Sequence, residues 1–299
     1  MNVTTPDGRT LHVHEGGDPN GFPVLMHHGS PSNGSLFPPH VEDARAQGIR
    51  LLGYDRPGYG GSSPSPGRSV GDAARDVEAI LDALGIERCA SWGISGGGPH
   101  VLACAALLPD RIAAAASLAA VAPFDADGLD WIDGMGESNI VEFNATLAGR
   151  DVLEQLLERE AADLRAADAE HVLAVLGPLL TPVDAAALTG AYAAYIVESS
   201  RDALAPGIEG WVDDDLAFAA PWGFDPVDIG VPLLLWHGDH DLFVPPAHGR
   251  WLTARIPGVD ARLSGEDGHL TLEAHRVPEV HRWLLERAHA SEAPFGPVR

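Results

Sequence analysis

Short apolar runs alternate with helical patterns over the first 122 residues of the chain. Four runs have the length and composition of buried strands: 23–28, 49–54, 88–94 and 112–122. Three segments between them have a helical pattern: 37–47, 69–84 and 97–108. In the segment 69–84, Val77, Ile80, Leu81 and Leu84 fall three and four residues apart, on one face of a helix. This alternation predicts right-handed crossovers in a mainly parallel α/β sheet.

A hairpin is predicted ahead of this pattern. Residues 11–15 alternate between apolar and polar, and the Asp7-Gly8 dipeptide before them favours a tight turn back to Val3 and Thr4. We expect residues 11–15 to form an edge strand.

The alternation stops at residue 123 and resumes near residue 227. Between these points, almost all residues fall in helical patterns: 130–148, 151–166, 169–176, 183–199 and 212–219. Strands then follow at 231–237 and 259–263, and helices at 246–256 and 277–290. We therefore expect a core domain made of residues 1–122 and 227–299, with residues 123–226 inserted as a helical cap or lid.

The strand at 88–94 runs into Gly93-Ile94-Ser95-Gly96-Gly97, which fits the G-x-S-x-G pattern of a nucleophile elbow. In an elbow, a serine sits on a sharp turn between a strand and a helix, and glycines let the two elements approach. A chain with 34 glycines matches this pattern easily by chance. Other motifs in the chain are therefore needed to distinguish a nucleophilic Ser95 from a serine in an ordinary turn.

Two polar loops follow the late strands. Asp241 lies in HGDHDLFVPP after the strand at 231–237, and we prefer it to Asp239 because it lies one turn further into the loop. His269 lies in GEDGHLTLE after the last strand. The order serine, acid, histidine is the one expected with this elbow, and the acid would orient the imidazole. We predict that Ser95, Asp241 and His269 form a catalytic triad.

The loop MHHGSPSNG at 26–34 follows an earlier central strand. A backbone N–H group in this loop, together with the one after the nucleophile, would hold the oxyanion of a tetrahedral intermediate. We predict that Ser30 and Gly96 supply these donors.

These motifs resemble those of the α/β-hydrolase superfamily, and the resemblance covers nearly the whole chain. It rests on His28-Gly29, DRPGYGGS at 55–62, GISGG at 93–97, the Asp241 loop and Gly268-His269. It implies an α/β-hydrolase fold: a mainly parallel eight-stranded sheet with helices on both faces and an inserted helical cap. It also implies structural roles for Asp55 and Arg56 in the loop after their strand.

The resemblance also implies a reaction. Relatives with aspartate at the elbow form an alkyl-enzyme ester, whereas serine at position 95 favours acyl transfer. We expect a serine hydrolase that cleaves a carboxylic ester or related acyl bond and needs no metal or organic cofactor. Prolyl aminopeptidases usually carry HGGPG and GGSWG, where this chain has HHGSPS and SWGISGG. Such a peptidase, or a non-hydrolytic lyase or cyclase with the same pocket, stays open as an alternative.

Several side chains are candidates for contact with substrate: His28, Ile94, Trp131, Phe143 and Trp222. Helix packing explains the cap aromatics equally well. Three cap carboxylates, Glu137, Glu142 and Glu198, would bind a substrate amine if the chain resembles the aminopeptidases in this respect. A solvated acidic face is the other interpretation.

Composition restricts the partners. The formal net charge is −24 and all 19 basic residues are arginine, so the chain lacks the clustered positive charge that nucleic acid and anionic membranes attract. No apolar run approaches the roughly 18 to 20 residues of a membrane span, and the N-terminus lacks a signal pattern. We expect a cytoplasmic monomer or homodimer with a small-molecule substrate, and buried, inert thiols at Cys89 and Cys104.

Overall fold

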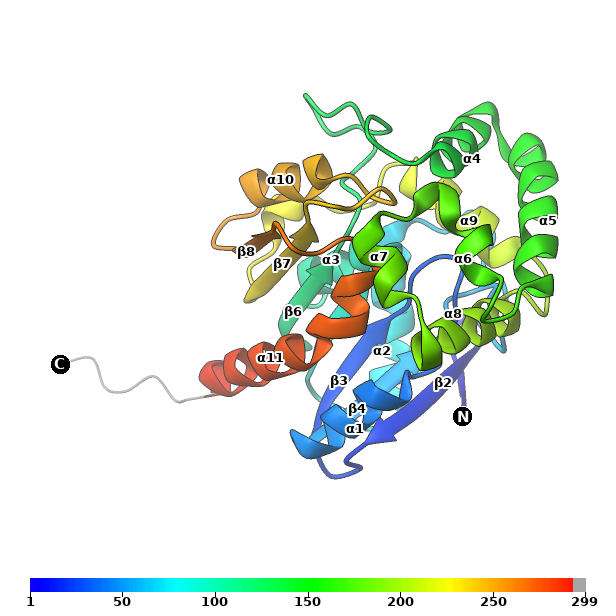
Figure 1. The fold of residues 1–299 in the computed structure, drawn as a ribbon. Coiled ribbons are helices and arrows are strands. Elements are labelled where there is room, and N and C mark those ends of the chain that lie inside the picture. The colour runs from blue at the N-terminus through cyan, green and yellow to red at the C-terminus, as the bar shows by residue number, and fades with distance from the viewer. Residues whose placement is uncertain (293–299) are drawn as a thin grey trace.

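The sheet at the centre of the molecule has eight strands (Figure 1). The computed structural model describes residues 1–292. The strands are β1 (Asn2–Thr4), β2 (Thr10–Gly17), β3 (Phe22–His27), β4 (Ile49–Tyr54), β5 (Cys89–Ile94), β6 (Ile112–Leu118), β7 (Leu233–Gly238) and β8 (Asp260–Ser264). Their order is β1-β2-β4-β3-β5-β6-β7-β8. Strand β2 is antiparallel to both of its neighbours and every other pairing is parallel, which confirms the predicted fold class.

Helices cover both faces of this sheet. They are α1 (Pro38–Ala46), α2 (Ala73–Ala83), α3 (Gly97–Leu107), α10 (Pro246–Arg255) and α11 (Val277–Glu292). Helices α1 and α11 pack together on one face, while α2, α3 and α10 share an apolar core on the other. Gly48 and Gly85, with φ of 71° and 64°, follow α1 and α2, where a glycine in the left-handed region commonly ends a helix. Shorter helical turns lie at Val70–Asp72, Gly177–Leu179, Pro226–Asp228 and Leu272–Arg276.

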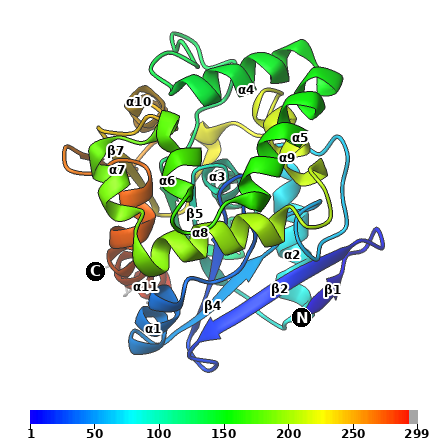
Figure 2. The same ribbon diagram turned by 45° about the vertical axis from the view of Figure 1, so that its right-hand side comes forward.

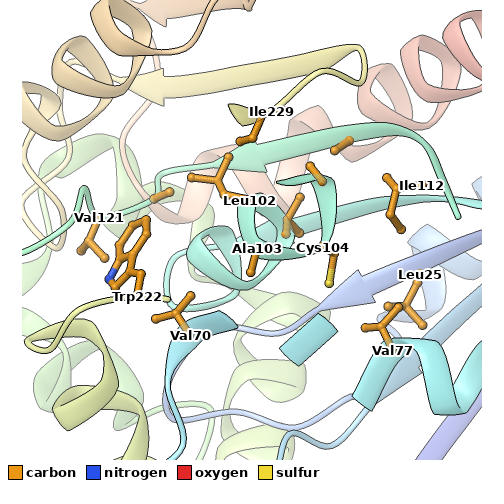
Figure 3. Packing of buried hydrophobic residues seen from close by; sticks show 14 of the residues in the cluster. Leu25, Val70, Val77, Leu102, Ala103, Cys104, Ile112, Val121, Trp222 and Ile229 are labelled. Carbon is orange, nitrogen blue, oxygen red and sulfur yellow. The ribbon is translucent and has the colours of Figure 1, made fainter. Parts of the chain in front are cut away.

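The larger apolar core holds the elbow helix α3 against the sheet. Figure 3 shows part of this core, with Leu25 from β3, Val77 from α2 and Cys104 from α3. All three are fully buried. Because each large apolar side chain contributes about 1.5–3 kcal/mol on burial, this packing makes a firm base for the turn at the end of β5.

Between β6 and β7 the chain leaves the sheet and forms a set of helices. These are α4 (Glu137–Ala148), α5 (Arg150–Ala166), α6 (Val172–Val175), α7 (Pro182–Ala187), α8 (Gly190–Ala203) and α9 (Glu209–Phe218). Figures 1 and 2 show them gathered over one end of the sheet. We call residues 123–226 the cap segment, and its status as a separate domain stays a prediction. Within residues 1–292, no helix is both long enough and apolar enough to cross a membrane.

Two predictions about the sheet are corrected. The hairpin is present, but β2 is not an edge strand, because β1 pairs with it on one side and β4 on the other. The strand predicted at 112–122 ends at Leu118. It ends there because Ala119 has φ of 47°, in the left-handed region, which no strand can continue.

Two predictions about the cap helices are also corrected. The helix predicted at 130–148 begins at Glu137, because Gly134 has φ of 87° and turns the chain just before it. The helix predicted at 183–199 is two helices, α7 and α8. Thr189 between them is extended and Gly190 has φ of 54°, so the chain changes direction there.

Candidate active site

Ser95 lies on the turn between β5 and α3, and its backbone is strained. Its φ of 55° falls in the left-handed region, which residues with a side chain rarely adopt. Two hydrogen bonds hold it there: its N–H donates to the Leu118 carbonyl at 2.9 Å, and its carbonyl accepts from Gly98 N–H at 2.8 Å. A strained serine between a strand and a helix is the geometry of a nucleophile elbow.

The glycines on either side of Ser95 are needed for steric reasons. A Cβ atom at Gly93 would lie 2.6 Å from the carbonyl oxygen of Gly97. One at Gly97 would lie 2.1 Å from the carbonyl oxygen of His27, on the neighbouring strand. No side chain fits at either position, so the motif's glycines let strand and helix approach as the sequence suggested.

His269 and Asp241 are brought together from loops 28 residues apart. The imidazole Nδ1 lies 2.7 Å from Oδ2 of Asp241, and both side chains are buried. Asp241 is itself held by the backbone N–H groups of Phe243 and Val244, each 2.8 Å from its Oδ1. The ring of Phe243 stacks on the imidazole with centroids 4.5 Å apart. Asp241 therefore fixes the imidazole so that Nε2 is the nitrogen free to face a substrate.

The charge of Asp241 governs the titration of His269. Burial alone would lower the pKa of His269, but the carboxylates of Asp241, Asp184 and Glu273 raise it above its ordinary value. Asp239, the rival acid, lies at the surface and accepts a hydrogen bond from Arg250 at 2.9 Å. The structure thus pairs His269 with the acid that the sequence favoured.

Ser30 and Gly96 lie side by side next to the elbow. A Cβ atom at Gly96 would lie 2.4 Å from the Ser30 Oγ, which shows how closely the two loops approach. Neither backbone N–H group donates a hydrogen bond to another described residue. Both N–H groups thus lack an acceptor among the described residues, as the donors of an oxyanion hole must.

A buried ion cluster holds the Ser30 loop in place. Asp214, from α9, accepts hydrogen bonds from the Ser30 hydroxyl at 2.6 Å, from Arg56 at 2.7 Å and from Arg68 at 2.8 Å. Tyr59 adds a fourth donor at 2.9 Å. Burial alone would raise the pKa of Asp214, but the two guanidinium groups hold it well below its ordinary value. Arg56 is therefore structural, as the resemblance implied, and its partner comes from the cap segment.

Asp55 is structural as well. Its carboxylate accepts from the backbone N–H groups of Gly34 and Gly61, each at 2.8 Å, and pairs with His14 at 2.7 Å. These bonds brace the loop that follows β4.

A cavity of about 380 Å³ lies over Ser95. This volume falls within the range of small-molecule sites. The cavity wall includes Ser95, His269, Ser30 and Gly96, together with the predicted substrate-contact residues Ile94 and Phe143. The core and the cap segment both contribute to it, through helices α4, α5, α8 and α9 on the cap side.

Three of the predicted substrate-contact residues do not line this cavity. His28 is buried beneath the loop, where its Nε2 accepts from the backbone N–H of Arg56 at 3.0 Å. Trp131 donates to the carbonyl of Ala122 at 2.7 Å and packs on His248. Trp222 belongs to the apolar core (Figure 3). Trp131 and Trp222 thus serve in packing, the alternative that the sequence left open for the cap aromatics, and His28 holds the backbone at Arg56.

One end of the cavity is acidic. Glu142, Glu160, Asp163 and Asp215 line it, and none of the arginines within residues 1–292 does. Burial raises the pKa of both Glu142 and Asp215, and the charge of Glu142 raises that of Asp215 further, so both carboxyls lose a proton less readily than they would in water. Burial and the nearby Glu142 raise the pKa of Glu160 to about 7. Of the three predicted amine-binding carboxylates, only Glu142 lies in the cavity wall.

The sequence interpretation missed the cap carboxylates Asp184, Asp214 and Asp215. All three are almost completely buried, although acidic runs are usually solvated. For the triplet at 213–215 a signal was present: it interrupts the otherwise apolar helix that runs from Trp211 to Phe218. Buried charges need partners, so such a run in an apolar helix predicts ion pairing.

The chain belongs to the α/β-hydrolase fold family, whose sequence model matches residues 23–275. A non-heme chloroperoxidase from Streptomyces lividans is 33% identical over 148 residues, which are 49% of this chain and 54% of that protein. The chain thus spans about half the length of that curated relative, and 38% and 43% of two others.

Solved structures share the fold over almost the full chain. An α/β-hydrolase fold protein from Nakamurella multipartita is 25% identical, with a TM-score of 0.68 over 97% of this chain and 99% of that one. An esterase from Exiguobacterium antarcticum is 21% identical, with a TM-score of 0.69 over 97% and 99% of the two chains. At such identities, the similarity establishes the fold.

Proposed function

We propose that this protein is a serine hydrolase that cleaves a carboxylic ester or related acyl bond of a small molecule. The observation that carries the proposal is a strained serine, Ser95, in the wall of the same cavity as a histidine, His269, whose far nitrogen is 2.7 Å from Asp241. Residues 123–226 would serve as the cap domain over this site.

The proposed reaction begins with attack by the Ser95 hydroxyl oxygen on the acyl carbon. The Nε2 atom of His269 takes the hydroxyl proton, and Asp241 stabilises the imidazolium that forms. The negative charge moves to the carbonyl oxygen, where the N–H groups of Ser30 and Gly96 donate to it. Collapse of this intermediate breaks the bond to the leaving alcohol, which departs with the proton from His269.

The second half of the reaction releases the acyl group. Water attacks the ester on Ser95 while His269 takes one of its protons. A second tetrahedral intermediate collapses, the proton returns to the serine oxygen and the carboxylic acid leaves. Ser95, His269, Ser30 and Gly96 lie in the cavity wall, and Asp241 contacts His269 from outside it.

Covalent labelling tests the proposal. A fluorophosphonate probe should label the full chain, and the S95A variant should not be labelled. The variant should also lose several orders of magnitude in kcat on p-nitrophenyl esters while its circular dichroism stays unchanged. Labelling at another residue, or turnover retained in S95A, would exclude Ser95 as the nucleophile.

The acidic end of the cavity favours a second candidate, cleavage of an acyl compound that carries an amine, as in a peptidase for N-terminal residues. The specific observation is that Glu142, Glu160, Asp163 and Asp215 face the same space as Ser95, and no described arginine lies in its wall. Comparing aminoacyl p-nitroanilides with p-nitrophenyl esters separates the candidates. A kcat/KM for the anilides above that for the esters would favour the peptidase.

A further inference from the structure

The loop that carries His269 is anchored by a carboxylate from the cap segment. Asp184, on α7, is completely buried and accepts three backbone hydrogen bonds from this loop. Its Oδ2 accepts from His269 N–H at 3.0 Å, and its Oδ1 accepts from Leu270 N–H at 2.8 Å and Thr271 N–H at 3.2 Å. Three successive N–H groups thus converge on one side chain.

The fit between this loop and the carboxylate leaves no spare room. A Cβ atom at Gly268 would lie 2.4 Å and 2.5 Å from the two carboxylate oxygens of Asp184. Gly268 N–H turns the other way and donates to the Thr271 hydroxyl at 2.8 Å. An asparagine at 184 would keep one acceptor oxygen, but its amide NH2 would face another N–H donor. The loop therefore matches a carboxylate and not its neutral analogue.

We propose that Asp184 is a positioning residue that sets where the imidazole of His269 lies over Ser95. The inference rests on the proposed function, in which that imidazole is the general base. Asp241 fixes the ring through Nδ1, and Asp184 fixes the backbone from which the ring projects. The first anchor comes from the core and the second from the cap segment, so a complete catalytic site requires the cap in place.

Asp184 also contributes charge. It is one of three carboxylates, with Asp241 and Glu273, that favour the protonated imidazole of His269. His237 faces the same group, with its Nε2 3.7 Å from Oδ2 of Asp241. Removal of the Asp184 charge should therefore lower the pKa of His269, an effect that a purely structural contact would not have.

The test compares D184N and D184A with D202N in the full chain. Asp202 lies exposed on α8, so D202N removes a cap carboxylate without touching the loop. We expect kcat on a p-nitrophenyl ester to fall about 100-fold in D184N and D184A, because an imidazole misplaced by about 1 Å costs this much. The acid limb of the kcat/KM profile should move to lower pH in D184N. D202N should match the unmodified chain in both respects.

A second measurement does not depend on turnover. In the S95A background, the imidazole of His269 is titrated by NMR, and the amide hydrogen exchange of residues 269–271 is followed. D184N should lower the imidazole pKa and speed this exchange. A folded D184N protein with neither change overturns the proposal. If both changes occur but the chain shows no Ser95-dependent turnover, the proposed function fails while the anchoring role of Asp184 stands.

Discussion

The hydroxyl of Ser30 donates to Oδ2 of Asp214 across 2.6 Å, and this bond joins the loop after β3 to helix α9 of the cap segment. Asp214 is completely buried, and Arg56 and Arg68 are almost so. The Ser30 loop therefore depends on an ion cluster whose only acid, among its described members, comes from the cap segment.

Removal of that acid should destabilise the fold. The D214A variant leaves two buried arginines without their anion, so the free energy of unfolding should fall by about 3–5 kcal/mol. Urea unfolding followed by tryptophan fluorescence measures this loss, with D202N as the surface control. A loss below about 1 kcal/mol, the usual contribution of an exposed pair, would mean that water reaches the cluster.

Asp241 should matter for chemistry more than for stability. The D241N variant keeps the side chain's shape but no longer favours the tautomer with a proton on Nδ1 of His269. We expect kcat to fall on the order of 10⁴-fold, the size seen for the acid of a catalytic triad. The matched control is D239N, two residues away, which loses only a surface pair with Arg250 and should retain full kcat. Equal losses in the two variants would argue against the assignment.

Gly96 should tolerate no side chain as long as Ser30 keeps its hydroxyl. In G96A, the new Cβ would press on Ser30 Oγ at 2.4 Å and push apart the two N–H groups that we propose as oxyanion donors. We expect kcat to fall about 10²-fold to 10³-fold, as for the loss of one donor. The S30A/G96A double variant removes the clashing oxygen and should recover part of this loss. Because S30A also removes the bond to Asp214, S30A alone is the reference. If S30A retains its kcat and the double variant is no better than G96A, the damage lies elsewhere.

The acidic end of the cavity predicts a pH-dependent preference for cations. Burial and the charges of Glu142 and Asp163 raise the pKa of Glu160 to about 7, although Arg159 acts to lower it. Below pH 7 the carboxyl is mostly protonated, and above it the group is mostly an anion. For two esters of equal shape, one ending in trimethylammonium and one in tert-butyl, KM of the cationic ester alone should fall between pH 6 and pH 8.

The E160Q variant should reduce that dependence, because its amide does not titrate. The neutral ester reports any change that reaches His269 and serves as the reference for both proteins. If KM of both esters varies with pH in parallel, the acidic end does not bind cations, and the second candidate function loses its support.

The core fold was predictable because its signals are local. Strand β4 has the predicted bounds of 49–54, and helices α1, α3 and α10 lie within a residue of the expected limits. Short apolar runs bounded by glycine or proline fix closely where a buried strand begins and ends. The exceptions arise where the backbone takes an unusual turn. Ala119 has a left-handed φ, and nothing in the alanine-rich sequence around it predicts this conformation.

The cap segment was less predictable, because its helices are set by distant contacts. The N–H of Gly136 donates to the carbonyl of Leu242 at 2.7 Å, and Leu242 lies in the loop that carries Asp241. Helix α4 begins at the next residue, Glu137. The triad candidates could be named from motif order alone, since each lies in a loop after a strand. Asp184 and Asp214 could not, because their importance lies in partners 85 and 184 residues away in sequence.

The two cap aspartates have a consequence for protein engineering. When enzymes share a core, exchanging one cap for another is an obvious way to change the range of substrates. Here a foreign cap would arrive without the side chains that secure the Ser30 and His269 loops, so the graft would disable the machinery it was meant to redirect. A transplant into this core must carry aspartates at the positions of 184 and 214, or the host loops must be redesigned to stand alone.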